Sequence, residues 1–247
     1  MLNLYCKIIQ LYKIISKIKK VKILRYMAKA LVMLVKSGPK GLWTEIKKKR
    51  RIQKVNCSFF IDEETRIKQQ QYSFKETPLI SILVPLYNTP QNYLNEMIAS
   101  VQGQTYSNWQ LCLADGSDEE HSFVGEFVEQ AQKTDSRIVY KKLEQNLGIS
   151  NNTNACIELA TGEYISLFDH DDLLHPSALY YVVQAINDQN ADFIYTDEVT
   201  FLEDNVKNLV NAHYKPDFSP DTLRSYNYIC HLTTFKKSLL KNTGAFR

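Results

Sequence analysis

The chain has 247 residues, 44% hydrophobic and 23% charged, which is enough for one domain with a buried core plus an appendage. The net charge of +3 hides an uneven distribution. Residues 1–54 carry 16 Lys and Arg against one acid, Glu45, whereas the rest of the chain carries 14 basic and 26 acidic residues. The five cysteines form no CxxC pair and are odd in number, which argues against a disulfide framework or a zinc site and favours reduced thiols in the cytosol.

Residues 1–54 are predicted to form a basic helical arm. Between Leu4 and Val35 the apolar residues recur every three or four positions, so they share one stripe of a helix, with most lysines elsewhere. The uncharged runs are too short to span a membrane, and charge interrupts the apolar part too often for a cleavable signal peptide. Gly38 and Pro39 predict the end of this helix.

The arm is expected to lie on an anionic membrane surface, because an apolar stripe opposite a cationic face is typical of interfacial helices. This hypothesis places the protein in the cytoplasm, peripheral on the inner face of the cell membrane. The alternative is a helix that packs on its own domain or on a partner. Nucleic acid is not an expected partner, since nothing downstream resembles a base-reading module.

The pattern changes after the arm. Residues 55–77 are polar and mixed, which predicts a linker, and residues 78–247 are predicted to form one globular domain. Short apolar runs predict strands at 79–85, 109–114, 138–142, 164–168 and 193–195. Helical spacing lies between them, at 93–102, 123–131, 149–160 and 177–186. This alternation predicts an α/β fold with a largely parallel sheet and crossover helices.

The strongest chemical signal is the acidic cluster that follows the fourth predicted strand, Asp169-His170-Asp171-Asp172. Side chains two positions apart on an extended backbone point to the same side, so Asp169 and Asp171 are predicted to aim at one point. Paired carboxylates suit a hard divalent cation, and such an ion binds diphosphates well. The alternatives are a solvated turn or a helix cap at Asp172.

Small and polar residues also follow the other predicted strands, and the carboxyl ends of parallel strands meet at one edge, where a ligand is expected. Asp115 is suited to accept hydrogen bonds from a uracil or a ribose, and Gly116 lets another backbone approach closely. The alternative for this pair is a plain tight turn. The residues at the first three strand ends are Pro85, Tyr87, Asn88, Asp115, Gly116, Ser117, Asn146, Leu147 and Gly148.

An ordered series of motifs resembles a known family. The run Ile80 to Asn88 (ISILVPLYN) resembles the opening of family 2 glycosyltransferases, and Asp169-His170-Asp171 looks like that family's D-x-D motif. Four further segments resemble the same family: 104–109 (QTYSNW), 113–117 (LADGS), 146–150 (NLGIS) and 160–164 (ATGEY). Its bacterial cell-surface polysaccharide branch is resembled at 195–198 (YTDE), 215–221 (KPDFSPD) and 227–232 (NYICHL). The resemblance covers about residues 78–247.

The resemblance implies a GT-A fold, which is Rossmann-like with a mostly parallel sheet and flanking helices. It also implies a UDP- or dTDP-linked sugar donor, Mg²⁺ or Mn²⁺, and inverting transfer to a cell-surface polysaccharide, a glycan or a lipid-linked acceptor. Asp169 and Asp171 match the metal-binding segment, and Asp171 matches the more direct ligand. The residues expected to hold the nucleotide are Pro85, Tyr87, Asn88, Asp115, Gly116, Asn146, Gly148 and Asp169.

The general base is not assigned by this resemblance. Family members of this type continue past Arg247 into an acidic motif that supplies it, so we expect this chain to be a donor-binding half, with the acceptor half missing, truncated or supplied by a second chain. Inversion needs a carboxylate that takes the acceptor's proton. Asp197 and Glu198 are the nearest substitutes, although they are expected to line the donor or acceptor pocket. The alternative function is a non-catalytic fragment or subunit that binds the nucleotide-sugar.

Three other enzyme classes fit less well. A haloacid-dehalogenase-like phosphatase wants Thr or Val four residues after the first Asp of its motif, where Leu173 stands. A dinucleotide-binding oxidoreductase should show G-x-G-x-x-G, which the eight glycines do not form. A nucleotidyltransferase should show a glycine-rich loop with an Arg after the first strand, where Pro85-Leu86-Tyr87-Asn88 stands.

Overall fold

The computed structural model describes residues 31, 32, 34–41, 43, 52, 53, 55–202 and 205–247. The chain divides into two compact units, Met1–Val55 and Asn56–Arg247. In the first unit, residues 31, 32, 34–41 and 43 are helical, so the helix assignment runs through Gly38 and Pro39, where the sequence predicted a helix end; Gly38 itself has a left-handed φ of 67°. The predicted apolar stripe lies almost entirely outside the described residues. Within the described part, no helix is long and apolar enough to cross a membrane.

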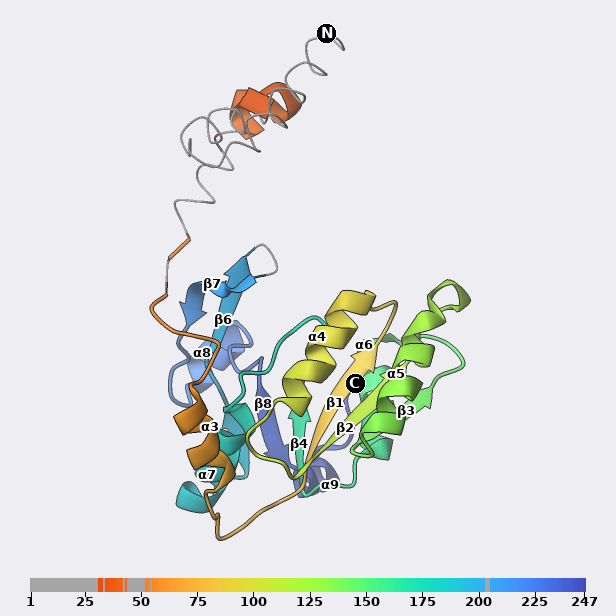
Figure 1. Cartoon of the computed structure of the whole chain (residues 1–247), viewed down its shortest axis with the longest axis vertical. Helices are drawn as coiled ribbons and strands as arrows, with labels where there is room; N and C mark the ends of the chain where they lie inside the picture. The colour runs from red at the N-terminus through yellow and green to blue at the C-terminus, as the bar shows by residue number, and fades with distance from the viewer. Residues whose placement is uncertain (1–30, 33, 42, 44–51, 54, 203–204) are drawn as a thin grey trace. The chain divides into compact units, whose positions relative to one another are not determined.

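The second unit is built on a six-stranded sheet with the order β3-β2-β1-β4-β8-β5 (Figure 1). Its strands are β1 (Ile80–Leu86), β2 (Trp109–Asp115), β3 (Ile138–Lys142), β4 (Tyr164–Leu167), β5 (Phe193–Tyr195) and β8 (Thr233–Lys236). β1 pairs in parallel with β2 and β4, and β2 pairs in parallel with β3. β8 is antiparallel to both its neighbours. The predicted, largely parallel sheet is confirmed, with one antiparallel strand that the sequence did not indicate.

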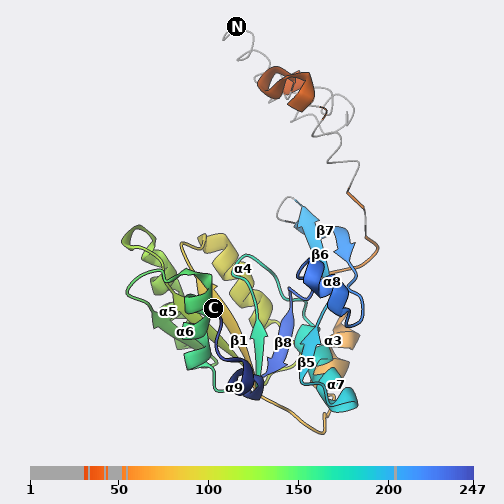
Figure 2. The ribbon, with the colours of Figure 1, turned by 180° about the vertical axis from the view of Figure 1, so that it is seen from behind.

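Four long helices connect the strands and cover both faces of the sheet (Figures 1 and 2). One hydrophobic cluster joins α4, α5 and α7 to one face of β1 and β2, and a second joins α6 to the opposite face. Strands buried on both faces favour apolar residues on both sides, which is why β1 is apolar except at Ser81. The helices are α4 (Gln91–Gln102), α5 (Phe123–Thr134), α6 (Gly148–Leu159) and α7 (Ala178–Gln189).

The segment 55–77, predicted to be a linker, contains the helix α3 (Glu63–Gln70), and from Asn56 onward it groups with the domain. Asp62 caps this helix by accepting a hydrogen bond from the Thr65 backbone N–H at 2.7 Å. The buried Gln69 side chain accepts a hydrogen bond from Thr105 Oγ1 at 2.9 Å. The segment is polar and mixed in composition, and these tertiary contacts leave no local pattern, so composition alone indicated a linker.

Several elements after β5 were not predicted from the sequence. The strands β6 (Glu198–Leu202) and β7 (Asn205–His213) pair as a separate antiparallel sheet. The other short elements after β5 are α8 (Pro220–Ser225), the 3-10 turn η2 (Lys237–Leu239) and α9 (Leu240–Thr243); a further 3-10 turn, η1 (Glu119–His121), lies between β2 and α5. β6 and β7 are amphipathic and irregular in register, so their sequence lacks the continuous apolar run that marks a central strand.

Gly162 sits where the chain enters β4 beside the start of β1. Its backbone N–H donates to Ser81 Oγ at 2.9 Å, which ties the two strands together. A Cβ at this position would lie 2.5 Å from the Leu79 carbonyl oxygen and 2.8 Å from the Ser81 nitrogen. Only a residue without a side chain fits so close to a neighbouring backbone.

Gly162→Ala is therefore expected to lower the free energy of unfolding by about 1–3 kcal/mol, the usual cost of overpacking a tight site. Urea denaturation of the full chain measures this loss. Gly103→Ala is the control, because there the nearest atom to an added Cβ, the Ala99 carbonyl oxygen, lies at 3.2 Å. Equal losses for the two variants would contradict the steric argument.

Candidate functional site

The carboxyl ends of β1 and β2 are joined by direct hydrogen bonds. Asn88, which follows β1 with a left-handed φ of 49°, donates its backbone N–H to Ser117 Oγ at 2.9 Å. Its side-chain amide donates to Asp118 Oδ2 at 2.8 Å and accepts from the Asp118 backbone N–H at 3.2 Å. Pro85 is half-buried within β1, whereas Tyr87 is exposed at its end. The structure thus brings the predicted residues of these two strand ends together and leaves the Tyr87 ring open to solvent.

Asp115 is fully buried at the end of β2. Its Oδ1 accepts the Ser117 backbone N–H at 2.8 Å, and its Oδ2 accepts from Tyr140 Oη at 2.9 Å and from Lys142 Nζ at 3.1 Å. The burial of Tyr140 and its bond to this carboxylate raise the pKa of the Tyr140 hydroxyl. Three donors therefore hold the Asp115 carboxylate in place, and the predicted nucleoside contact would have to use its remaining lone pairs.

Gly116 and Asn146 bring the ends of β2 and β3 into close contact. A Cβ on Gly116 would lie 3.0 Å from the Asn146 Cα, so a side chain there would force the two loops apart. Asn146 Oδ1 accepts from the Gly148 backbone N–H at 3.0 Å and from Asn152 Nδ2 at 2.8 Å. Gly148 begins α6 with a left-handed φ of 80°. These predicted residues thus shape the loop beside Asp115.

The acidic segment after β4 is a turn, which corrects the expectation of an extended backbone there. The Asp172 backbone N–H donates to the Asp169 carbonyl oxygen at 3.3 Å, so the chain reverses within these residues. In a turn, side chains three apart can meet, whereas the alternation of an extended strand is lost. Asp169 and Asp172 both approach His231, with carboxylate oxygens 3.3 and 3.4 Å from its Nδ1. One ligand atom from each of the three residues lies within 4.8 Å of the others.

His231 reaches this cluster because β8 pairs with β4. The antiparallel register places Leu167 opposite Thr233. Counting two residues further along both strands brings Asp169 opposite His231, and each of these residues lies just outside its strand. The sequence interpretation assigned His231 no role, because only the pairing of two distant strands sets this contact.

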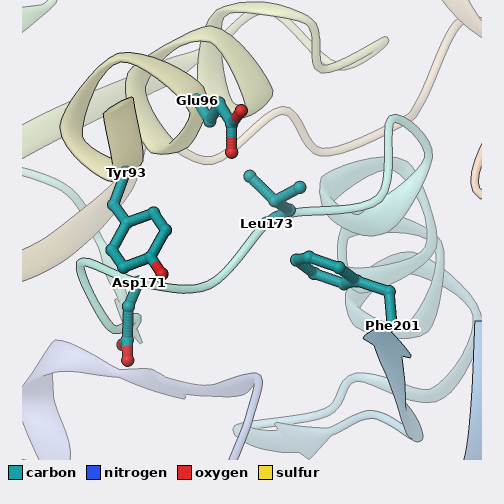
Figure 3. A pocket seen from close by; sticks show the side chains of 5 residues that line it. All are labelled: Tyr93, Glu96, Asp171, Leu173 and Phe201. Carbon is teal, nitrogen blue, oxygen red and sulfur yellow. The ribbon is translucent and has the colours of Figure 1, made fainter. Parts of the chain in front are cut away.

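Asp171, which belongs to the same turn, is not one of the three residues of this cluster. It is exposed and lines a hollow of about 110 Å³ together with Tyr93, Glu96, Leu173 and Phe201. Figure 3 shows the Glu96 carboxylate, the Leu173 side chain and the Phe201 ring facing the hollow, while the Asp171 carboxylate points away from Glu96. The ligand atoms that gather within 4.8 Å of one another belong to Asp169, Asp172 and His231, and the predicted ligand Asp171 is not among them.

The three clustered side chains suit a divalent cation. Two carboxylates and an imidazole form an oxygen and nitrogen donor set, which fits Mn²⁺ well and Mg²⁺ through its oxygens. Burial raises the pKa of the Asp172 carboxyl, His231 lowers it, and the neighbouring Asp169 and Asp171 raise it further. A bound cation would reduce the repulsion between these negatively charged carboxylates.

Asp197 and Glu198, the weak candidates for a general base, both have partners in the structure. Asp197 Oδ1 accepts the Lys215 backbone N–H at 2.7 Å. Glu198 Oε1 lies 2.9 Å from His213 Nδ1, and its Oε2 lies 3.4 Å from Lys215 Nζ. Burial raises the pKa of Glu198, but the contacts with His213 and Lys215 outweigh it and leave the pKa lowered. A lowered pKa makes Glu198 a weaker proton acceptor.

Comparison with known proteins identifies the family. Residues 81–243 match the family model described as glycosyl transferase family 2. The chain therefore belongs to glycosyl transferase family 2.

Two relatives and one solved structure illustrate the range of similarity. The chain is 42% identical over 183 residues to the uncharacterized protein y4gI of Sinorhizobium fredii, a match that covers 74% of this chain and 20% of the relative. It is 30% identical over 172 residues to the O-antigen biosynthesis protein RfbC of Myxococcus xanthus, covering 69% of this chain and 13% of the relative. This chain thus spans a fifth or less of the length of these relatives.

The solved structure is that of S. aureus TarS, residues 1–349, in complex with UDP. The TM-score is 0.53 at 17% identity, and the match covers 68% of this chain and 49% of that one. At this identity the likeness concerns the fold alone, and it confirms the predicted GT-A architecture.

The geometry and the sequence pattern disagree on which carboxylate would hold a cation, and two matched variants separate them. Asp172→Asn is expected to weaken Mn²⁺ binding about tenfold or more, because it removes one of the three clustered ligands. Asp171→Asn removes the same charge from the same turn and is expected to have a smaller effect. Calorimetric titration of the full chain with Mn²⁺ measures both. A larger loss for Asp171→Asn would favour the pairing predicted from the sequence.

Proposed function

We propose that this chain binds a nucleoside-diphosphate sugar, linked to UDP or dTDP, and transfers the sugar with inversion to a cell-surface polysaccharide, glycan or lipid-linked acceptor. The observation that carries the proposal is the cluster of Asp169, Asp172 and His231 after the end of β4, the strand that pairs in parallel with β1. The names of two relatives, an O-antigen biosynthesis protein and a putative teichuronic acid biosynthesis glycosyltransferase, support the acceptor class. The UDP complex of TarS supports the donor class.

In this proposal each part of the sheet edge has its own task. The exposed Tyr87 ring would offer a face to the base, and the absence of a side chain at Gly116 leaves room for the Asn146 loop to pack beside Asp115. Asp115, held by its three donors, would present a fixed negative charge to the base or ribose. Asp169, Asp172 and His231 would hold Mg²⁺ or Mn²⁺. The cation would neutralise the charge that develops on the departing nucleoside diphosphate.

A second candidate function is a nucleotide-sugar-binding unit that needs another segment for transfer. It is favoured by the partners of Asp197 and Glu198, since the carboxylates closest to a base role are already engaged by Lys215 and His213. A positioned general base contributes about 10²–10⁴-fold to rate. Binding of the donor without transfer is the behaviour expected of this alternative.

Binding of the donor nucleotide provides the first test. UDP or dTDP is expected to bind the full chain in a Mn²⁺-dependent manner, with affinity falling at least about tenfold after chelation or in Asp169→Asn. Asp188→Asn, at an exposed acid on α7, is the matched control and should keep wild-type affinity. Isothermal calorimetry gives the affinities, and release of UDP or dTDP from sugar-nucleotides with added acceptors gives the transfer rate. Nucleotide binding with no metal dependence would contradict the proposed site.

The basic arm completes the proposal by placing the enzyme at its acceptor. Residues 1–54 would hold the protein on the cytoplasmic face of the membrane, with lysines against anionic headgroups and apolar residues in the interface. What supports this is the charge of the arm and its helical spacing, together with the membrane-bound assembly that a lipid-linked acceptor requires.

The full chain is expected to sediment with vesicles that contain anionic lipid and to be released by high salt. Each Lys or Arg near such a surface contributes about 1 kcal/mol, screened within a Debye length of about 8 Å at physiological ionic strength. Zwitterionic vesicles are the control. Equal binding to both kinds of vesicle, unaffected by salt, would show that charge does not hold the arm at a membrane.

A further inference from the structure

A buried lysine lies directly behind His231. The Lys215 side chain is only 1% exposed. Its ammonium donates to the backbone carbonyls of Cys230 and His231, the latter at 2.9 Å, and lies 3.4 Å from Glu198 Oε2. A buried ammonium is costly unless its donors are used and its charge is balanced. Two hydrogen bonds to carbonyl oxygens and one ion pair with a carboxylate therefore hold the ammonium in one place.

Lys215 is itself held at both ends. Its backbone N–H donates to Asp197 Oδ1 at 2.7 Å, while its ammonium forms an ion pair with Glu198. Glu198 is in turn fixed by His213, whose Nδ1 donates at 2.9 Å because an ionised carboxylate can only accept. The two adjacent acids that follow β5 therefore fasten the main chain and the side chain of one lysine.

The element that Lys215 holds is the segment that carries His231. The His231 backbone has a left-handed φ of 51°, which a residue with a side chain keeps only when its surroundings enforce it. Lys215 binds the carbonyls of His231 and of the residue before it. On the other side, Leu232 donates its backbone N–H to Thr196 Oγ1 at 3.1 Å. Fixed in this way, His231 presents Nδ1 to Asp169 and Asp172 at 3.3 and 3.4 Å.

We propose that Lys215, fastened by Asp197 and Glu198, is a positioning residue that holds His231 against Asp169 and Asp172 and so prearranges a divalent-cation site. Lys215 contacts the His231 carbonyl and none of the three ligand atoms. The inference rests on the proposed function, since it concerns the cation that the cluster would hold. It also gives Asp197 and Glu198 a role that differs from general-base catalysis.

The direction of the effect on Mn²⁺ binding decides between positioning and simple electrostatics. Lys215→Met keeps the length and apolar stem of the side chain but removes a positive charge near the cluster. Coulomb's law alone predicts tighter cation binding after that loss. Positioning predicts binding weakened about 10- to 100-fold, as for other residues that orient a metal ligand. Calorimetry of the full-length chain with Mn²⁺ alone measures the change.

Lys237→Met is the matched control. Lys237 Nζ also donates to a backbone carbonyl, that of Ala160 at 2.5 Å, but on a segment that carries no residue of the cluster. Its loss is expected to leave Mn²⁺ affinity within about twofold of the wild type. Pulsed electron paramagnetic resonance adds a direct readout, because it detects a nitrogen bound to Mn²⁺. That coupling should be present in the wild type and in Lys237→Met, and lost or reduced in Lys215→Met.

A double-mutant cycle tests whether Lys215 acts through His231. In a His231→Ala background, Lys215→Met should weaken Mn²⁺ binding no further, because the residue that it positions is gone. Independent, additive losses would overturn the proposal. Tighter or unchanged binding in Lys215→Met alone would overturn it as well.

A second pair of variants keeps the test sharp if Lys215→Met does not fold, which circular dichroism would reveal. Asp197→Ala and Asp197→Asn remove the same charge from an exposed residue, but Asn retains an oxygen that accepts the Lys215 backbone N–H. Weaker Mn²⁺ binding in Asp197→Ala, rescued in Asp197→Asn, supports positioning, and equal affinities overturn it.

Absence of Mn²⁺ binding by the wild type overturns this inference and the cation of the proposed function together. If the wild type binds Mn²⁺ and Lys215→Met binds it with the same affinity, this inference alone is overturned.

Discussion

The parallel pairing of β1 with both β2 and β4 is the constraint on which the rest of the structure depends. It places the carboxyl ends of these strands at one edge of the sheet, so the loops that follow them must meet. Burial on both faces holds this register, because a shift by one residue would move every apolar side chain to the wrong cluster. The close approach at Gly162 and its bond to Ser81 lock the entry of β4 at the other end.

The antiparallel strand β8 then adds what the parallel strands lack. Because β8 pairs with β4 in the antiparallel direction, the second residue before its start lies opposite the second residue after the end of β4, and His231 meets Asp169. A parallel strand in the place of β8 would have put its carboxyl end, and the loop after it, next to the end of β4. The reversed strand instead brings an imidazole from far along the chain to two carboxylates, which changes an acidic turn into a mixed donor set.

Most polar residues at this edge of the sheet hydrogen-bond to neighbouring loops, whereas Tyr87 is exposed to solvent. Hydrogen bonds to neighbouring parts of the chain are made by Asp115, Asn88 and Asn146, and these bonds hold the edge of the sheet in place. Rigid surroundings are what a binding site requires if its geometry is to be ready before the ligand arrives. Lys215 belongs to the same kind of support, one layer behind the cluster, and Tyr87 remains open to solvent.

The sequence by itself determined the α/β fold, because the strands of the doubly covered sheet are apolar runs separated by helical spacing, and 138–142 and 193–195 lie where the strands form. It also located the strand ends, since their residue types are local signals. It could not locate α3, because the residues of this helix are mostly polar, or β8, because this strand has only four residues, TTFK. It paired Asp169 with Asp171 because alternation assumes an extended backbone, whereas the chain turns there. Only the tertiary structure brought Asp172, His231 and Lys215 together, because contacts between residues far apart in the chain are set by strand order and register, which no local pattern encodes.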